Sequence, residues 1–172
     1  PAPPARRAGS EQSLRDSTSG DDGVQAVTDV VVSGGTLTVT AAGGAGSDVS
    51  EDASAKGLKR DVGVVVGDDA TVTVDAADDA LHSDGAVSVS GGTVELSSGD
   101  DGVHADGDVT VSGGDLTVTT SVEGIEGAPL TISGGDVDVT ASDDGLNATV
   151  GSTTGTGERD AAAGDALARR HI

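Results

Sequence analysis

The sequence contains no Phe, Tyr, Trp, Met or Cys. Without aromatic side chains, a hydrophobic core must be built from small aliphatic residues, and these would fill a compact globule of 172 residues poorly. The lack of cysteine excludes disulfides and thiolate metal sites. No apolar run reaches the length of a transmembrane helix, so we expect no membrane insertion.

Basic residues are scarce as well. Nine Lys and Arg stand against 30 Asp and Glu, which gives a formal net charge of -21. From Asp61 to Glu158 there are 20 acidic residues and no Lys or Arg. Nucleic acid is not an expected partner, because phosphate binding requires clustered basic residues. The natural partner for this charge is a cation.

The acidic residues follow an internal repeat. A pair of acidic residues followed by Gly or Ala recurs, and its second member falls on four positions spaced by 22, 22 and 21 residues: Asp79, Asp101, Glu123 and Asp144. Two copies further upstream place Asp22 and Lys56 in the same column. Six partial or complete copies account for residues 21–150. We expect residues 1–20 to be a disordered leader and residues 151–172 to be a linker and tail, with an Ala-rich stretch compatible with a short helix.

Each copy has the same internal pattern of aliphatic residues. In the copy that starts at Asp101 they are Val103, Val109, Val111, Leu116 and Val118. Alternation with a period of two indicates β-strands, and the Gly-Gly between the two alternating pairs permits a positive φ at a corner. One such coil could not fold alone, so neighbouring coils must stack. The sequence therefore predicts an all-β, single-stranded parallel β-helix of five to six coils with about 22 residues each; the nine-residue repeat of calcium rolls does not match.

Stacking would turn the repeat into ladders of charge. Equivalent residues of successive coils lie about 4.8 Å apart in a parallel β-helix. Two carboxylates at that distance repel by about 0.9 kcal/mol in water and about 3.5 kcal/mol at an effective dielectric constant of 20. The column of Asp79, Asp101, Glu123 and Asp144 is unbroken, whereas Val122 interrupts the neighbouring column of Asp78, Asp100 and Asp143. Protons or bound cations must offset this repulsion, and at neutral pH cations are the better candidate.

Calcium suits these seven acidic residues, because it takes six to eight oxygen ligands in a flexible arrangement. Magnesium would accept fewer protein ligands, and zinc would prefer more nitrogen or sulfur; His82 and His104 could stack, but histidines one coil apart are more often exposed turn residues. The alternative is that the Asp-Asp-Gly sequences only form Asx turns and provide solubility.

A second polar column lies one position beyond the first aliphatic residue of each copy. It consists of Gln25, Lys59, His82, His104, Glu126 and Asn147, and we take the last five as candidates for ligand binding. Within the repeat region, the only basic residues are Lys56, Lys59 and Arg60. They either pair with carboxylates such as Asp79 and replace a metal at that level, or contact an anionic ligand.

The strings "DDGVHADGDVTVSGG", "VEGIEGAPLTISGG" and "TASDDGLNA" resemble a bacterial family of secreted carbohydrate-binding domains over about residues 21–150. The resemblance implies a right-handed parallel β-helix with bound calcium, an architecture like that of pectate lyases, and binding of cellulose and of acidic sugars such as polygalacturonate. It also implies a secreted or cell-surface location. By this resemblance the family's acidic motif positions are Asp79, Asp101, Glu123, Glu126 and Asp144.

The residues independently favour an acidic sugar. Pyranose rings usually stack on Trp or Tyr, and this chain has neither. A uronate carboxylate could instead complete the coordination of a protein-held calcium. The expected function is therefore that of a non-catalytic, calcium-dependent carbohydrate-binding module, which we expect to be a monomer. The alternatives are a calcium-rigidified structural or adhesin repeat and a calcium-dependent lyase, whose base could only be Lys56, Lys59 or His82.

Overall fold

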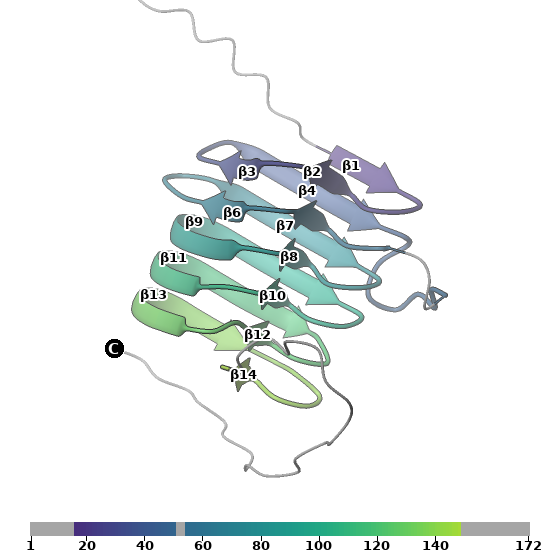
Figure 1. Ribbon diagram of the computed structural model, residues 1–172. Helices are drawn as coiled ribbons and strands as arrows, with labels where there is room; N and C mark the ends of the chain where they lie inside the picture. Colours follow the sequence, from purple (N-terminus) through teal and green to yellow (C-terminus); the bar gives the residue numbers. More distant parts are fainter. Residues whose placement is uncertain (1–15, 51–53, 149–172) are drawn as a thin grey trace, which may run out of the picture.

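The structure is a computed structural model that describes residues 16–50 and 54–148. These residues form fourteen β-strands and no helix. Parallel sheets stack into a β-solenoid of about six turns, and equivalent residues of successive turns are roughly 22 apart (Figure 1). The predicted fold class is confirmed. No helix in the part of the chain that the structure describes could span a membrane.

One face of the solenoid is a sheet of short strands. Its order is β14-β12-β10-β8-β5-β2, and every neighbouring pair is parallel. Each short strand begins two residues after the ladder position of its coil, which is acidic in every coil except that of Lys56, so this sheet positions the ladder residues. The strands are β2 (Val24–Ala26), β5 (Leu58–Arg60), β8 (Leu81–Ser83), β10 (Val103–Ala105), β12 (Ile125–Glu126) and β14 (Leu146–Asn147).

The other strands form a larger sheet, which bends around the remaining sides of the coil (Figure 1). Its main path contains β1 (Asp16–Ser19), β4 (Thr36–Ala41), β7 (Thr71–Ala76), β9 (Ala86–Ser98), β11 (Val109–Thr120) and β13 (Leu130–Val139). Off this path, β3 (Asp29–Val32) pairs with β6 (Gly63–Val66), and β6 pairs with the first part of β9.

The Gly-Gly pairs mark the predicted corners. Gly92, Gly114 and Gly135 have φ values of 79°, 85° and 86°, which are left-handed conformations that side chains disfavour. In β9, β11 and β13 the backbone pairing nevertheless continues through the corner, so that two predicted strands form one bent strand. The corner is thus a bend in a continuous ladder, marked by register shifts beside the glycines.

The predicted inward aliphatic residues form the core. In the copy that starts at Asp101, all five are at most 1% exposed. Stacking makes this possible, because each small side chain packs against its equivalents above and below. In the last described coil Ile132 is 39% exposed, since β13 pairs with β11 alone among the described strands.

The solenoid begins earlier than the sequence predicted. Strand β1 lies within residues 1–20, where we expected a disordered leader, and pairs with β4. Its sequence, DSTS, has no aliphatic residue to reveal a strand. Ser17 is placed against the chain instead by a hydrogen bond from its Oγ to the Gly23 carbonyl at 3.0 Å. Residues 1–15 and the predicted tail lie outside the described residues.

Candidate functional site

The polar column of the short-strand sheet has the predicted register. In the strand pairing, Gln25 lies beside Lys59, Lys59 beside His82, and His82 beside His104. The column continues from His104 to Glu126 and from Glu126 to Asn147. Five of the strands that carry these residues are labelled in one row in Figure 1, β2, β8, β10, β12 and β14, and β5 lies between β2 and β8. The sheet therefore presents one polar side chain per coil along a single line.

The acidic column runs beside this line. Backbone amides of the residues that follow Asp79, Asp101 and Glu123 donate to the carbonyls of Asp101, Glu123 and Asp144 at 2.8–2.9 Å. These bonds hold the acidic residues of neighbouring coils in register, one above the other. The predicted register of the acidic column is thus confirmed. We call this column the acidic ladder and each step along it a level, and the side-chain contacts differ from one level to the next.

At the first level an ammonium group lies between the carboxylates. The Nζ atom of Lys56 is 2.6 Å from Asp79 Oδ2 and 2.9 Å from Asp78 Oδ2. Burial would raise the pKa of Asp79, but the hydrogen bond from His82 and the charge of Lys56 outweigh it and lower this pKa to about 2. Burial would lower the pKa of Lys56, yet the charge of Asp79 raises it. The predicted pairing of Lys56 with Asp79 is confirmed.

Both carboxylate oxygens of Asp79 already have partners at this level. Besides Lys56, its Oδ2 contacts His82 Nδ1 at 2.8 Å, and its Oδ1 accepts from the Asp101 amide at 3.2 Å. The Asp78, Asp79 and Asp100 carboxylates come within 4.8 Å of one another. Lys56 supplies positive charge to this group, so a metal ion here would have to displace it.

Lys59 and Arg60, the other two basic residues of this coil, make different contacts from those of Lys56. Lys59 lies 3.3 Å from Asp22 and donates to Ser54 at 2.8 Å. Arg60 forms no ion pair with a carboxylate of the described residues, so the first of the two alternatives does not hold for this residue. Its position on β5 faces inward, so the side chain is fully buried, and Nη1 donates to the Thr28 carbonyl at 2.6 Å. Among the described residues, Nε and Nη2 of Arg60 have no hydrogen-bond partner.

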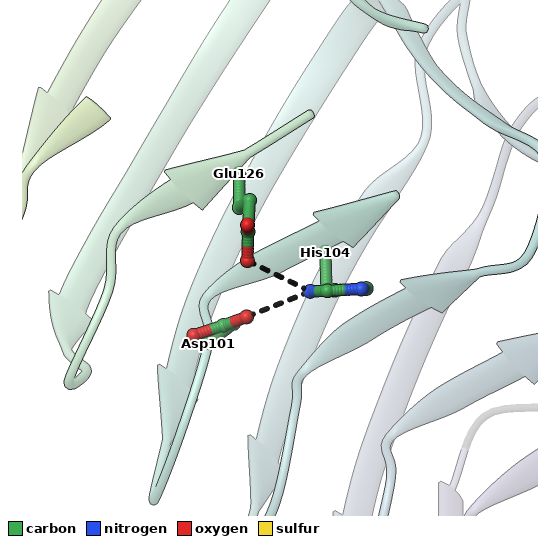
Figure 2. Close-up of side chains that lie close together, drawn as sticks. All are labelled: Asp101, His104 and Glu126. Atoms are coloured by element: carbon green, nitrogen blue, oxygen red, sulfur yellow. Dashed lines mark hydrogen bonds and ion pairs between the residues drawn. The ribbon is translucent and has the colours of Figure 1, made fainter. Parts of the chain in front are cut away.

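The middle level combines an imidazole with two carboxylates (Figure 2). Nδ1 of His104 lies 2.9 Å from Asp101 Oδ2 and 3.1 Å from Glu126 Oε2. Asp101 precedes β10, His104 lies on β10, and Glu126 comes from β12, one coil further on. Stacking therefore brings together two columns and two coils at this point.

The negative potential at the middle level favours bound protons. The hydrogen bond with Asp101 raises the pKa of His104 to about 9 despite burial, and nearby carboxylates add to the effect. Burial raises the pKa of Asp101 to about 6; the bond from His104 opposes this shift, and the charges of Asp79 and Asp100 increase it. Burial also raises the pKa of Asp100, with Asp79 and Asp78 contributing. The carboxylates of the middle level therefore stabilise a positive charge at this site.

The last level offers only oxygen atoms and an amide. Asn147 Nδ2 donates to Glu123 Oε2 at 2.9 Å. Burial raises the pKa of Glu123; the bond from Asn147 opposes the shift, and Glu126, Asp144 and Asp143 contribute further negative charge. Asp143 and Asp144 are exposed. Oxygen donors of this kind suit calcium, so Glu123, Asp143 and Asp144 are candidates to hold it. Among the described residues, however, three potential metal ligands come within 4.8 Å of one another only at the first and middle levels.

Two acidic residues beside the histidines were not singled out from the sequence. Nε2 of His82 lies 3.2 Å from Asp84 Oδ1, and Nε2 of His104 lies 3.6 Å from Asp106 Oδ1. Each histidine thus has an aspartate on either side of its ring. The strings "DDALHSD" and "DDGVHAD" could have revealed these contacts. The last aspartate of each string follows the histidine by two residues, which places both side chains on the same face of an extended chain.

Comparison with known proteins gave one match, to a protein-family model. A protein-family model described as "Carbohydrate-binding domain-containing protein" matches residues 13–102 and 86–124. Searches of curated proteins and of solved structures gave no match. The matched residues include the first level of the ladder, Asp101 and His104 of the middle level, and Glu123 of the last; Glu126, Asp143 and Asp144 lie beyond the match.

Proposed function

Because the chain belongs to the family of carbohydrate-binding domain-containing proteins, we propose that it is a non-catalytic module that binds an acidic polysaccharide through calcium. The family supports the carbohydrate-binding role. The supporting observation for calcium and an acidic sugar is the last level of the ladder, where the negative charges of Glu126, Asp144 and Asp143 act on Glu123, and where the described residues include no Lys or Arg. A polygalacturonate-like chain is the proposed ligand.

The charge balance along the ladder supports the last level as the binding point. Lys56 and Lys59 form ion pairs with the carboxylates of the first coils. From Asp61 onward the described residues contain no Lys or Arg. A divalent cation at the last level would reduce the repulsion among its carboxylates and leave coordination positions for a uronate carboxylate. An acidic protein could then hold an acidic polymer.

The surroundings of the three candidate bases favour a binding module over a lyase. A lyase needs a base that is free to take a proton from the sugar. Lys56 and Lys59 each form an ion pair with an aspartate. His82 lies between Asp79 and Asp84, at 2.8 and 3.2 Å. None of the three is positioned as a free base, and the proposal assigns no catalytic residue.

Cellulose is a second candidate ligand, and the outer face of the larger sheet favours it. Thr36, Thr71 and Thr93 stand in register on neighbouring strands, and Thr38 stands beside Thr73. Threonine hydroxyls in such columns could donate to and accept from a neutral glucan lying along the solenoid. Since both ligand classes are extracellular polymers, we place the protein outside the cell or at its surface as part of this proposal.

The test is a titration of polygalacturonate, with calcium and with chelator. We expect binding only with calcium, and much weaker binding of methyl-esterified pectin, which lacks the free carboxylate. The double variant Glu123→Gln/Asp144→Asn should lose most of the affinity. The control variant Asp115→Asn/Asp136→Asn removes the same charge from neighbouring positions on β11 and β13 and should retain it. Binding that survives chelator, or an equal loss in both variants, would exclude a calcium bridge at this level.

A further inference from the structure

We propose that Asp101, His104 and Glu126 form a site for a transition-metal divalent cation such as Zn²⁺, separate from the calcium site proposed at the last level. The inference does not depend on the calcium proposal. It starts from the arrangement in Figure 2, where both carboxylates point at the same imidazole nitrogen.

The distances suit a metal ion. The Nδ1 atom of His104 is 2.9 Å from the Asp101 oxygen and 3.1 Å from the Glu126 oxygen, and the three donor atoms lie within 4.8 Å of one another. Zinc binds nitrogen and carboxylate oxygen at about 2.0–2.2 Å, which places neighbouring donors roughly 3 Å apart. The two donor pairs that share His104 already have this separation.

The imidazole nitrogen determines which metal is favoured. Calcium takes oxygen ligands, whereas imidazole suits zinc, copper and nickel. Zinc sites that keep an open position have three protein ligands, and both histidine nitrogen and carboxylate oxygen bind zinc. Glu123 and Asp144 lie nearby in the acidic ladder but offer only oxygen, so the nitrogen distinguishes the middle level from the last.

The surroundings of His104 hold its ring in place. The rings of His82 and His104 are stacked, with centroids 5.0 Å apart and planes within 6°. The Asp101 residue is only 7% exposed, which restricts its carboxylate. On the other side of the ring, Nε2 faces Asp106 Oδ1 at 3.6 Å. A carboxylate next to the second nitrogen of a metal-binding histidine commonly orients the ring and increases its basicity.

The neighbouring coil provides an internal control. His82 makes the same contact with Asp79, at 2.8 Å, that His104 makes with Asp101. One coil further on, however, His82 meets the ring of His104 rather than a carboxylate. Asp79 also carries the Lys56 ammonium group. Within residues 16–50 and 54–148, two carboxylates therefore face the same imidazole nitrogen only at His104.

The experiment measures binding of Zn²⁺, and of Co²⁺ as a spectroscopic probe, to the full chain by calorimetry and visible absorption. We expect one site with nitrogen coordination. His104→Gln should weaken zinc binding by about tenfold or more, while His82→Gln should change it less than threefold. Glu126→Gln, on a separate strand, should weaken it as His104→Gln does. Circular dichroism and thermal unfolding in chelator show whether each variant keeps the fold.

Calcium binding, measured on the same variants, separates the two proposals. His104→Gln should leave the calcium affinity within about twofold, because calcium takes oxygen ligands. An equal loss of zinc affinity in His82→Gln and His104→Gln would overturn the proposed site, as would zinc binding that neither variant affects. Failure of calcium to bind the wild-type chain would count against the proposed function and leave the zinc result unchanged.

Discussion

Single side chains set the chemistry of each level in this ladder, because the backbone repeats while the side chains do not. Lys56, Asp79, Asp101 and Glu123 occupy equivalent positions in successive coils. The first is an ammonium group, and the second accepts from that ammonium group and contacts the imidazole of His82. The third contacts the imidazole of His104, and the fourth accepts from an amide. One column thus passes from carboxylates paired with a lysine to carboxylates that have no Lys or Arg partner among the described residues.

Replacing Lys56 by Gln should destabilise the fold, because the Asp79 carboxylate would remain buried with His82 as its remaining side-chain partner. The expected loss in free energy of unfolding is about 1–3 kcal/mol. Lys59→Gln is the matched control: this ion pair is longer, at 3.3 Å, and its lysine is more exposed, so its loss should cost about 0–1 kcal/mol. Urea unfolding at pH 7 in chelator measures both. Equal losses would mean that burial of the pair contributes nothing.

Proton binding by His104 should make stability depend on pH. Its pKa is about 9 in the fold and 6.5 ordinarily, so the folded state binds the proton more tightly. The resulting stabilisation is complete below pH 6.5 and is lost as the pH rises through about 9. The raised pKa of Asp101 acts in a separate window, where stability decreases as the pH rises from 3.8 to about 6.

Urea unfolding in chelator between pH 6.5 and just above pH 9 measures the effect of His104. In His104→Gln the decrease should be much smaller than in the wild type. His82→Gln serves as the control and should retain most of the decrease. A wild-type profile that is flat over this interval would contradict the assignment.

At the level of the strands, the corners decide how closely the coils stack. Gly114 has a φ of 85°, and a Cβ atom there would lie 2.6 Å from the carbonyl carbon of Gly91 in the preceding coil. The backbones therefore approach more closely than any side chain allows. The strands on both sides of the corner can keep their inter-coil hydrogen bonds only because the glycine is there.

Gly114→Ala should lower the free energy of unfolding by about 1–3 kcal/mol from backbone strain, with the steric overlap adding to this loss. Gly34→Ala is the control, because a Cβ atom at Gly34 would meet nothing within 4 Å. This second change should stay within about 0.5 kcal/mol of the wild type. Chemical denaturation of the two variants provides the comparison, and a tolerated Gly114→Ala would show that the coils can shift apart.

For the molecule as a whole, the dominant quantity is its charge. A net charge of -21 on 172 residues makes the compact state repel itself. Monovalent salt reduces this repulsion by screening, while a bound divalent cation reduces it at particular carboxylates. The two effects can be separated by comparing salts at equal ionic strength.

The melting temperature should therefore rise with NaCl and rise further with CaCl₂ at the same ionic strength. MgCl₂ should have a smaller effect, because magnesium retains its water and accepts fewer protein ligands. Chelator should lower the melting temperature of protein that has been purified without it. Thermal unfolding followed by circular dichroism measures all four conditions. If NaCl and CaCl₂ stabilise the chain equally, screening alone acts and the ladder holds no calcium.

The sequence by itself determined the coil, the register of both polar columns and the inward aliphatic residues. It could do so because a solenoid converts a period along the chain directly into stacking. A residue such as His104 therefore faces its equivalents, His82 and Glu126, whatever the details of packing. The same reasoning located the corners, since only glycine adopts their backbone conformation at low cost.

Only the tertiary structure decided how the side chains that share a line contact one another. The Lys56–Asp79 pair was expected, but the contacts of His82 with Asp84 and of His104 with Asp101 and Asp106 were not. Arg60 turns into the interior, where its side chain is fully buried, instead of pairing with a carboxylate. These contacts depend on side-chain direction and on residues a full coil away, whose distances are set by stacking.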